Sequence, residues 1–541
     1  MPWEINFTIF NFIIICLWFF NSFIDYCEYV YYWQLKWYRF DRYLDFLKSE
    51  QGKIFIFRKS YVIRTAFASL IFLWPVNEMF LIKIFIIIFY LTDFIYLNYR
   101  RIKGHLYRPI FSLKAILIIF LAFFFESVWI LYYRNWQVVL LALVMRPILI
   151  ALTVLLVNFC TDLIKKVFFI RAKNKMKKYK NLLVIGITGS YGKTTTKEFL
   201  FEILSKKFKV FKTPENINSD LGVSRLILNT DFSAYDIFIV EIGAYNVGDV
   251  KLLCDIVKPK IGILTAINEQ HLSLFGNIKN TQKAKYELLN ALPSDGLGIT
   301  NSDNEYCREL LDEPKARILT FGMDEEYKPN MLIEDAKMLA DGMSFTVKTF
   351  FDDHDCGANL ITKVLGIYNT LNIAPCILTA LYLKMDRQII IDAVNNLKNP
   401  HKILDIFNYG KAIIIDASYN SNPDGFRADL EILNSYPSTK KRIVVTRGML
   451  ELGEKSEELH EAIGGEIAYM ADELVISTSD FIKPLKKGVG NKYHTEIKIL
   501  LVHKDLLDYI KSLKNKEVVI LLENRMPSIL LKELEKYKNK K

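Results

Sequence analysis

Apolar residues are unevenly distributed along the chain, and their pattern predicts two parts of different kinds. Before residue 160, long apolar runs follow one another, whereas later short apolar runs alternate with stretches of helical periodicity. Runs of about 20 apolar residues are long enough to cross a bilayer as helices, while short runs are typical of buried strands. We therefore expect an α-helical transmembrane region followed by a soluble α/β region.

Five stretches of this first part are candidate membrane spans. The first is nearly uncharged and no small-residue cleavage site follows it, so we interpret it as a span rather than a signal peptide. The second is short and contains Arg64, which makes it the weakest of the five. The candidate spans are residues 5–24, 61–75, 79–97, 110–132 and 136–157.

The basic residues predict how these spans are oriented. The loops 25–60 and 98–109 are rich in Lys and Arg, whereas the connections on the opposite side are nearly free of them. By the positive-inside rule, the N-terminus lies outside and the chain from residue 160 onward lies in the cytoplasm. Residues 161–180, with eight basic side chains from Lys165 to Lys180, predict a juxtamembrane linker that faces anionic lipid. The sequence thus predicts a multi-pass protein of the cytoplasmic membrane.

Two further features of the membrane region point beyond simple anchoring. Residues 31–47 mix aromatic with charged residues and are compatible with an amphipathic helix along the interface. Asp93, Glu126 and Arg146 fall within or near the spans. Charge inside a membrane indicates either a functional site or a structural ion pair, and the sequence leaves both open.

Composition and charge restrict the class of protein. A chain of 541 residues is too long for one core, and two to four domains are expected. The net charge of +11 is compatible with nucleic-acid binding, but the basic residues cluster beside apolar segments, so we expect no nucleic-acid partner. Seven cysteines without a C-x-x-C pair or metal-ligand spacing indicate reduced thiols on a cytoplasmic face.

A strand, a glycine-rich turn and a helix follow one another at residues 182–204, an order typical of a phosphate-binding site. The apolar run 182–187 predicts a buried strand, and apolar spacing predicts a helix that begins at Lys193. Free N–H groups and the helix dipole attract a phosphate there. Lys193 would reach the β- and γ-phosphates, and Thr194 or Thr195 would hold Mg²⁺. The general P-loop pattern has glycine where Ile187 stands, so the match fails at one residue.

Three more residues have the chemistry that such a site needs. Glu241 ends the predicted strand 236–240, and a carboxylate at the end of a strand beside a phosphate loop commonly holds Mg²⁺. His271 follows a second predicted strand, and Lys285 lies on a predicted helix. Taken alone, His271 is compatible with a surface histidine and Lys285 with one charge among several.

Together these phrases resemble the Mur ligase family, the ATP-dependent amide ligases of cell-wall peptide synthesis. The resemblance covers about residues 181–541 and includes the phrases 188–195, 216–223, 416–423 and 449–460. It implies a central P-loop-type α/β ATP-binding domain at 181–400 and a Rossmann-like α/β domain at 401–541. Short β-rich runs at 412–415, 442–446, 473–477, 498–502 and 517–522 independently favour a mostly parallel sheet in the second of these.

The resemblance also implies a reaction. A carboxylate of a muramoyl-peptide attacks the γ-phosphate of ATP, and an amino acid or a dipeptide such as D-alanyl-D-alanine displaces the resulting acyl phosphate. Two Mg²⁺ ions are implied, one held by Thr194 and Glu241 and the second by His271, with Lys285 carbamylated beside it. Lys193, His271 and Lys285 are the implied catalytic residues. The implied ATP contacts are Thr188, Gly189, Ser190, Gly192, Lys193, Thr194, Thr195, Lys402, Asp416 and Asn420.

This sequence departs from the family pattern at several positions. Ala266 replaces an asparagine that contacts adenine, Tyr368 replaces a histidine, and Lys402 replaces an ATP-contacting arginine. A late K-G-S-R phrase survives only as 522–525. The membrane spans stand where the family has a soluble domain that binds the UDP-sugar substrate. The acceptor is therefore either UDP-linked or carried by a membrane lipid.

Two other functions remain open from the sequence. One is a membrane-bound amide ligase that makes a poly-γ-glutamate-like polymer, although the phrases 416–423 and 449–460 do not favour it. The other is a membrane scaffold with a degenerate ATPase domain. Intact Lys193, Glu241, His271 and Lys285 argue against this second alternative.

Overall fold

The computed structural model shows two compact units, Met1–Val167 and Phe168–Lys541, each of which is considered by itself. The structure describes residues 9–48, 50–72, 79–103, 106–133, 136–214, 217–268, 275–339, 341–350, 356–400, 404–418, 422–449, 452, 455–490 and 494–538.

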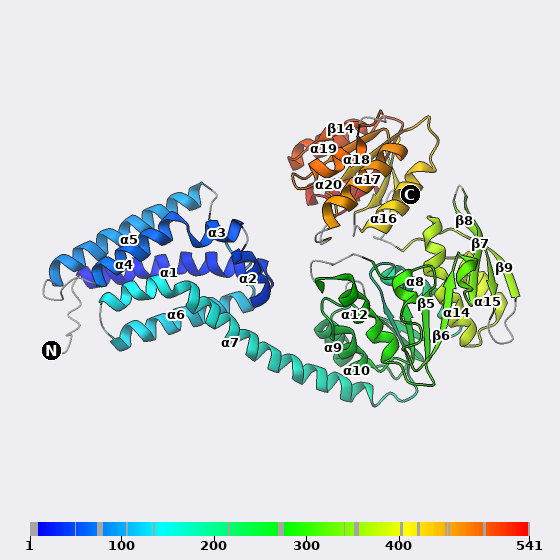
Figure 1. Cartoon of the computed structure of the whole chain (residues 1–541), viewed down its shortest axis with the longest axis horizontal. Helices are drawn as coiled ribbons and strands as arrows, with labels where there is room; N and C mark the ends of the chain where they lie inside the picture. Colours follow the sequence, from blue (N-terminus) through cyan, green and yellow to red (C-terminus); the bar gives the residue numbers. More distant parts are fainter. Residues whose placement is uncertain are drawn as a thin grey trace. The chain divides into compact units, whose positions relative to one another are not determined.

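The first unit is wholly helical over the described residues that form regular structure (Figure 1). Three of its helices are long and apolar enough to cross a membrane, with apolar stretches at Phe12–Leu35, Leu113–Tyr132 and Leu140–Met176. The other two predicted spans coincide with α4, of only 14 residues, and with α5, which contains Asp93, Arg100 and Arg101. The helices are α1 (Ile9–Leu35), α2 (Phe40–Lys48), α3 (Glu50–Ile56), α4 (Lys59–Phe72), α5 (Met79–Ile102), α6 (Leu113–Tyr133) and α7 (Trp136–Met176).

Ion pairs join five of these helices in the interior of the unit. Asp25 of α1 accepts hydrogen bonds at Oδ2 from Arg64 Nη1 of α4 at 2.8 Å and from Arg146 Nη1 of α7 at 2.7 Å. Arg64 also contacts Asp93 of α5 at 2.6 Å, and Arg146 contacts Glu126 of α6 at 3.1 Å. Asp93, Glu126 and Arg146, which the sequence placed within or near the predicted spans, are therefore ion-paired, as buried charges must be in a medium of low dielectric constant.

The second unit contains two sheets with helices on their faces, which confirms the predicted fold class. The first sheet has nine strands in the order β2-β3-β1-β4-β5-β6-β7-β8-β9, parallel from β2 to β7 and antiparallel from β7 to β9. Its strands are β1 (Leu183–Thr188), β2 (Val210–Lys212), β3 (Ile237–Glu241), β4 (Ile261–Leu264), β5 (Leu297–Asn301), β6 (Arg317–Gly322), β7 (Met331–Leu339), β8 (Gly342–Thr349) and β9 (Cys356–Thr362).

The second sheet has six strands in the order β10-β11-β15-β12-β13-β14, of which only the β10–β11 pair is antiparallel among the described pairings. The apolar runs predicted β11, β12, β13 and β15 to within two residues at each end. β14 begins two residues before its predicted range, and β10 was not predicted. The strands are β10 (Asp405–Tyr409), β11 (Ala412–Ala417), β12 (Lys441–Thr446), β13 (Glu473–Ile476), β14 (Glu496–Ile499) and β15 (Val518–Glu523).

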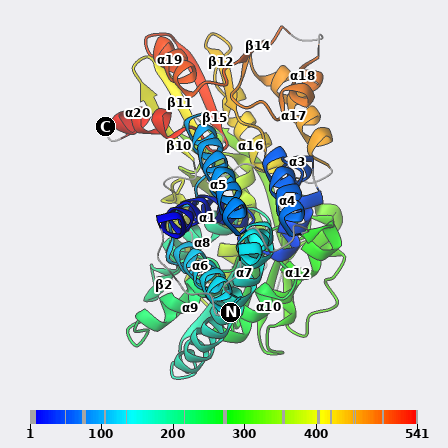
Figure 2. The same cartoon turned by 90° about the vertical axis from the view of Figure 1, so that its left-hand side faces the viewer.

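Helices cover both faces of each sheet, which explains why the strands are apolar on both sides. Ile185 and Ile187 of β1 pack with Phe199 and Leu200 of α8, and Val184 packs in a cluster on the opposite face. In the second domain, α17 and α18 lie side by side in both views (Figures 1 and 2). The helices of the first sheet are α8 (Lys193–Leu204), α9 (Asp220–Asn229), α10 (Asp249–Val257), α12 (Ile278–Asn290), α13 (Glu305–Arg308), α14 (Thr370–Tyr382) and α15 (Arg387–Asn395), and those of the second are α16 (Pro423–Asn434), α17 (Ser456–Met470), α18 (Ile482–Val489), α19 (His503–Leu513) and α20 (Ser528–Lys538).

Arg146→Met is expected to lower the thermal unfolding midpoint of the detergent-purified protein. The substitution leaves the buried Glu126 carboxylate without its arginine, and breaking a buried ion pair in this way typically costs about 3–5 kcal/mol. Arg101→Met on the exposed surface of α5 is the control and should leave the midpoint unchanged. Equal midpoints for Arg146→Met and wild type, by differential scanning fluorimetry, would contradict a structural role for the ion pairs.

Candidate active site

The turn between β1 and α8 can only form with glycine at two positions. Gly189 has φ +151° and Gly192 has φ +75°, both in the left-handed region that side chains disfavour. A Cβ at Gly189 would lie 2.0 Å from Thr265 Oγ1, and one at Gly192 would lie 2.3 Å from Asn372 Oδ1. The turn thus approaches neighbouring chain segments closely and leaves α8 with an open N-terminus.

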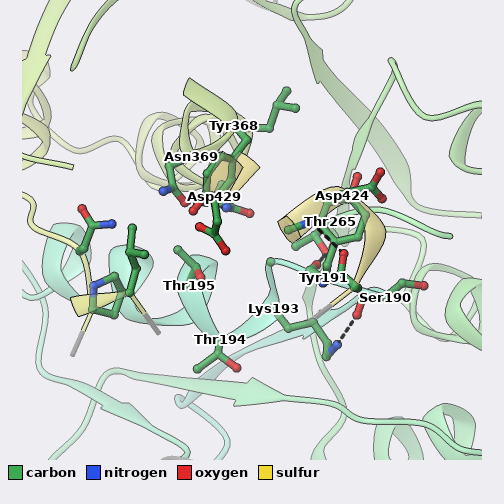
Figure 3. A pocket seen from close by; sticks show the side chains of 18 of the residues that line it. Ser190, Tyr191, Lys193, Thr194, Thr195, Thr265, Tyr368, Asn369, Asp424 and Asp429 are labelled. Atoms are coloured by element: carbon green, nitrogen blue, oxygen red, sulfur yellow. Dashed lines mark hydrogen bonds between the residues drawn. The ribbon is translucent and has the colours of Figure 1, made fainter. Parts of the chain in front are cut away.

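Lys193 begins α8 and lies against the turn itself. Its ammonium donates hydrogen bonds to the carbonyl oxygen of Gly189 at 2.7 Å and to that of Ser190 at 3.1 Å, the second of which is drawn in Figure 3. Burial lowers the pKa of Lys193, while the carboxylate of Glu241 raises it. The cation is thereby placed within the loop that would surround a phosphate.

Glu241, at the end of β3, accepts hydrogen bonds from three side chains. Thr194 Oγ1 and Asn218 Nδ2 each lie 3.1 Å from its Oε1, and Lys197 Nζ lies 3.1 Å from its Oε2. Burial raises the pKa of Glu241, but the ammonium groups of Lys197 and Lys193 outweigh it and hold the pKa below its ordinary value. The group is therefore an anion at neutral pH.

The donor set at this position fits Mg²⁺. The Thr194 hydroxyl and the Glu241 carboxylate are oxygen ligands, which a small hard cation prefers. The sequence predicted this pair but gave no role to Asn218 or to the fully buried Lys197. Both residues orient the carboxylate. The sequence did not reveal their contacts with Glu241, because they lie 23 and 44 residues away from it in the chain.

Lys285 on α12 is a buried lysine without a partner of opposite charge among the described residues. It is only 2% exposed, and its ammonium lies 5.9 Å from the ring centre of Phe275. Burial, and then the positive charge of Lys193, lower the pKa of Lys285 well below its ordinary value, although Asp249 opposes them. Such an amine is neutral in a larger fraction of molecules than an exposed lysine, and a neutral amine is a nucleophile.

A cavity of about 250 Å³ opens above the turn and is lined by both α/β domains. Figure 3 shows Tyr368, Asn369 and Asp429 on the same side as Thr195, and Tyr191 and Asp424 on the other. Burial, and then the charge of Asp429, raise the pKa of the Tyr368 phenol well above its ordinary value, so Tyr368 is a neutral donor. The substitution of the expected histidine therefore removes a titratable cation from the cavity wall.

Asn268 ties the phosphate loop to the C-terminal domain. Its backbone N–H donates to Ser190 Oγ at 3.1 Å, and its side-chain Nδ2 donates to Asp424 Oδ2 at 2.7 Å. The position expected to contact adenine is Ala266, whose carbonyl oxygen accepts from Ser190 N at 2.8 Å. Sequence reasoning missed Asn268, since the two residues it joins lie far away in the chain.

Not every predicted residue lies at the cavity. Thr188 donates from its hydroxyl to the Ile242 carbonyl at 2.9 Å, below the turn, and does not line the cavity. Asp416 of β11 forms an ion pair with Lys538 of α20 at 2.7 Å and does not line it either. His271, Lys402 and Asn420 lie outside the described residues. Ser190, Gly192, Lys193, Thr194 and Thr195 do line it.

Comparison with known families identifies the second unit. A profile described as Mur ligase middle domain matches residues 187–380, and one described as Mur ligase, glutamate ligase domain matches residues 405–522. The chain belongs to the Mur ligase family. It is therefore an ATP-dependent, ADP-forming ligase, which excludes the degenerate-ATPase scaffold that the sequence left open. Both profiles lie wholly within the second unit.

Individual relatives agree with this assignment. The UDP-N-acetylmuramoyl-tripeptide–D-alanyl-D-alanine ligase of Buchnera aphidicola is 28% identical over 372 residues, which cover 68% of this Mur ligase and 78% of the relative. The enzyme of the same name from Bacillus subtilis is 25% identical over 346 residues, covering 63% and 72%. The crystal structure of MurF ligase from Thermotoga maritima in complex with ADP superposes with a TM-score of 0.59 at 25% identity, covering 69% of this chain and 84% of that one.

Lys193→Ala is expected to reduce ATP turnover by about two orders of magnitude or more. A positioned cation opposite a transferring phosphoryl group contributes about that much to the rate. ADP release would be measured with saturating acceptor and Mg²⁺. Lys206→Ala, at an exposed position just beyond α8, is the control for loss of a lysine and should keep wild-type turnover. ATP turnover by Lys193→Ala at a rate near that of the wild type would contradict the assignment of this turn as a phosphate-binding site.

Proposed function

We propose that this Mur ligase joins an amino donor like D-alanyl-D-alanine to the carboxylate of a muramoyl-tripeptide. The observation that carries the proposal is the placement of Lys193, Thr194 and Glu241 around one open helix N-terminus at the cavity. The printed names of the relatives supply the substrate class. The phrases at 416–423 and 449–460 favour this donor over a poly-γ-glutamate-like product.

The reaction follows from the charges at the site. The acceptor carboxylate attacks the γ-phosphorus of ATP, the bond to the β–γ bridging oxygen breaks, and ADP leaves with that electron pair. The amine of the donor then attacks the acyl carbon, phosphate leaves, and one proton is lost from the new amide nitrogen. Lys193 and the backbone N–H groups of α8 stabilise the transferring phosphoryl group. Mg²⁺, held by Thr194 and Glu241, would neutralise further phosphate charge.

Lys285 is proposed to react with CO₂ to form a carbamate. The neutral amine adds to the carbon of CO₂ and loses one proton, so an uncharged buried amine becomes an anion. The burial of Lys285 beside Lys193 supports this step, because two ammonium groups near one another are unfavourable whereas an ammonium and a carbamate attract. The resulting anion would suit a second Mg²⁺, for which His271 is the other proposed ligand.

Lys285→Ala is expected to lower ligation strongly, and bicarbonate should restore activity to CO₂-depleted wild type but not to this variant. Lys283→Ala, two residues earlier on the same helix and exposed, is the matched control. Activity would be followed as ADP formed at several bicarbonate concentrations. A wild-type rate for Lys285→Ala, or equal bicarbonate responses of both variants, would contradict the carbamate.

The first unit is proposed to place the ligase at the cytoplasmic face of the membrane. Three helices of sufficient length and apolarity and the basic segment 25–60 support insertion with this orientation. The acceptor is then either the UDP-linked muramoyl-peptide or one carried by a membrane lipid. Positive charge at this face would attract a diphosphate-bearing lipid, which favours the second acceptor.

Full-length protein should ligate a lipid-linked muramoyl-peptide faster than its UDP-linked counterpart. A shortened chain of residues 162–541 is the comparison, because Ala172 and Met176 are part of the core of the ligase unit and a start at 175 would remove the first of them. Product would be identified by mass spectrometry for each acceptor. If the shortened chain uses the UDP-linked substrate as fast as the full-length chain and the lipid-linked one no better, the first unit serves only as an anchor.

A further inference from the structure

The helical unit contains a second cavity that the ligase reaction does not use. Its volume is about 380 Å³, within the range of sites that bind small ligands, and α1, α2, α3, α4 and α7 contribute to its walls. The walls are almost entirely apolar and aromatic. Trp33 and Tyr43 stack there with ring centres 3.9 Å apart at 13°, so part of the wall is rigid and preformed.

The apolar face of α2 lines this cavity. Phe40, Tyr43, Leu44 and Leu47 follow one another at the i, i+3, i+4, i+7 spacing of one helix face, and all four are wall residues. Opposite them, Ala151 and other residues of α7 form the facing wall. The face that would normally pack against a neighbouring helix thus borders open space.

Two polar groups belong to residues of the walls, but the indole nitrogen of Trp33 is itself buried, so only the guanidinium of Arg58 is accessible to a ligand. Trp33 is fully buried, and its indole N–H has no hydrogen-bond partner among the described residues. A buried donor of this kind normally has an acceptor. Arg58 donates from Nη1 to Glu28 at 2.6 Å, and its guanidinium lies 5.3 Å from the ring centre of Phe55. The other guanidinium nitrogens of Arg58 have no described protein acceptor.

The net charge of the segment that borders the cavity indicates that its ligand is an anion. Residues 36–59, which include α2 and α3, contain seven basic and three acidic residues, an excess of four positive charges. Basic pockets between membrane helices on the cytoplasmic side attract anionic lipid headgroups. The same segment is the one that the positive-inside rule places at that side.

We propose that this cavity binds one anionic glycerophospholipid of the cytoplasmic leaflet. One hydrocarbon chain lies between α2 and α7, and the phosphate oxygens accept hydrogen bonds from Arg58. The proposal rests on the membrane insertion argued above but not on the identity of the ligase acceptor. The lipid completes the packing of α2, which would otherwise leave aromatic side chains against an unfilled space.

Native mass spectrometry of the full-length protein in mild detergent tests the site. After removal of loosely bound lipid, one phosphatidylglycerol molecule should bind at least tenfold more tightly than phosphatidylcholine. Ala151→Trp fills the cavity and should abolish the preference, whereas Leu156→Trp, on an exposed α7 position outside the cavity, should keep it. Arg58→Gln removes the guanidinium cation and should weaken phosphatidylglycerol binding several-fold.

Three results would overturn the proposal. They are equal binding of both lipids, unchanged binding in both Ala151→Trp and Arg58→Gln, and co-purification of a polyprenyl diphosphate in place of a glycerophospholipid. ADP formation with the UDP-linked acceptor is measured in each variant. A variant that loses lipid binding but forms ADP at the normal rate gives information on the lipid site alone. Absence of ADP formation by the wild type would instead contradict the proposed ligase function.

Discussion

The active site depends on the parallel pairing of β1 with β3. In this pairing Ile187 stands opposite Glu241, so the strand that leads into the phosphate loop has the carboxylate proposed to hold Mg²⁺ as its neighbour. Pairing of β1 with β4 on the other side brings Thr265 to the loop, where its hydroxyl donates to the Tyr191 carbonyl. Because parallel strands end at the same edge of a sheet, the phosphate loop, the Glu241 carboxylate and the Thr265 hydroxyl that supports the loop all meet at that edge.

The protonation states of the charged side chains at the site depend on one another. Glu241 stays ionised because Lys197 and Lys193 oppose the effect of burial, and Lys193 in turn disfavours a second cation at Lys285. A carboxylate held by an ammonium, a hydroxyl and an amide cannot rotate freely. The orientation of Glu241 is thus established before a metal arrives, which is what preorganised electrostatic catalysis requires.

Local pattern and resemblance predicted the elements of the ligase unit, but not how distant residues combine. Strands β1, β3 and β4, five of the six strands of the second sheet, the turn and the Thr194–Glu241 pair follow from short motifs and apolar runs. The bond from Asn268 to Asp424 and the ion pair of Asp416 with Lys538 do not, because each joins segments more than a hundred residues apart that carry no mutual signal in one sequence. In the helical unit, the sequence likewise identified Asp93, Glu126 and Arg146, but it took Arg64 only as evidence against a span and gave no role to Asp25, which joins Arg64 to Arg146.

The helical unit is built more elaborately than membrane attachment requires. One apolar helix inserts in effect irreversibly, whereas this unit buries charged groups whose desolvation is unfavourable unless every partner is in place. Ion pairs that connect α1, α4, α5, α6 and α7 fix the relative positions of these helices, and such fixed positions are what a cavity of defined shape needs. The buried charges and the aromatic cavity therefore depend on one another: the ion pairs hold the helices apart, and the space left between them is the cavity proposed above to take the hydrocarbon chain of a lipid.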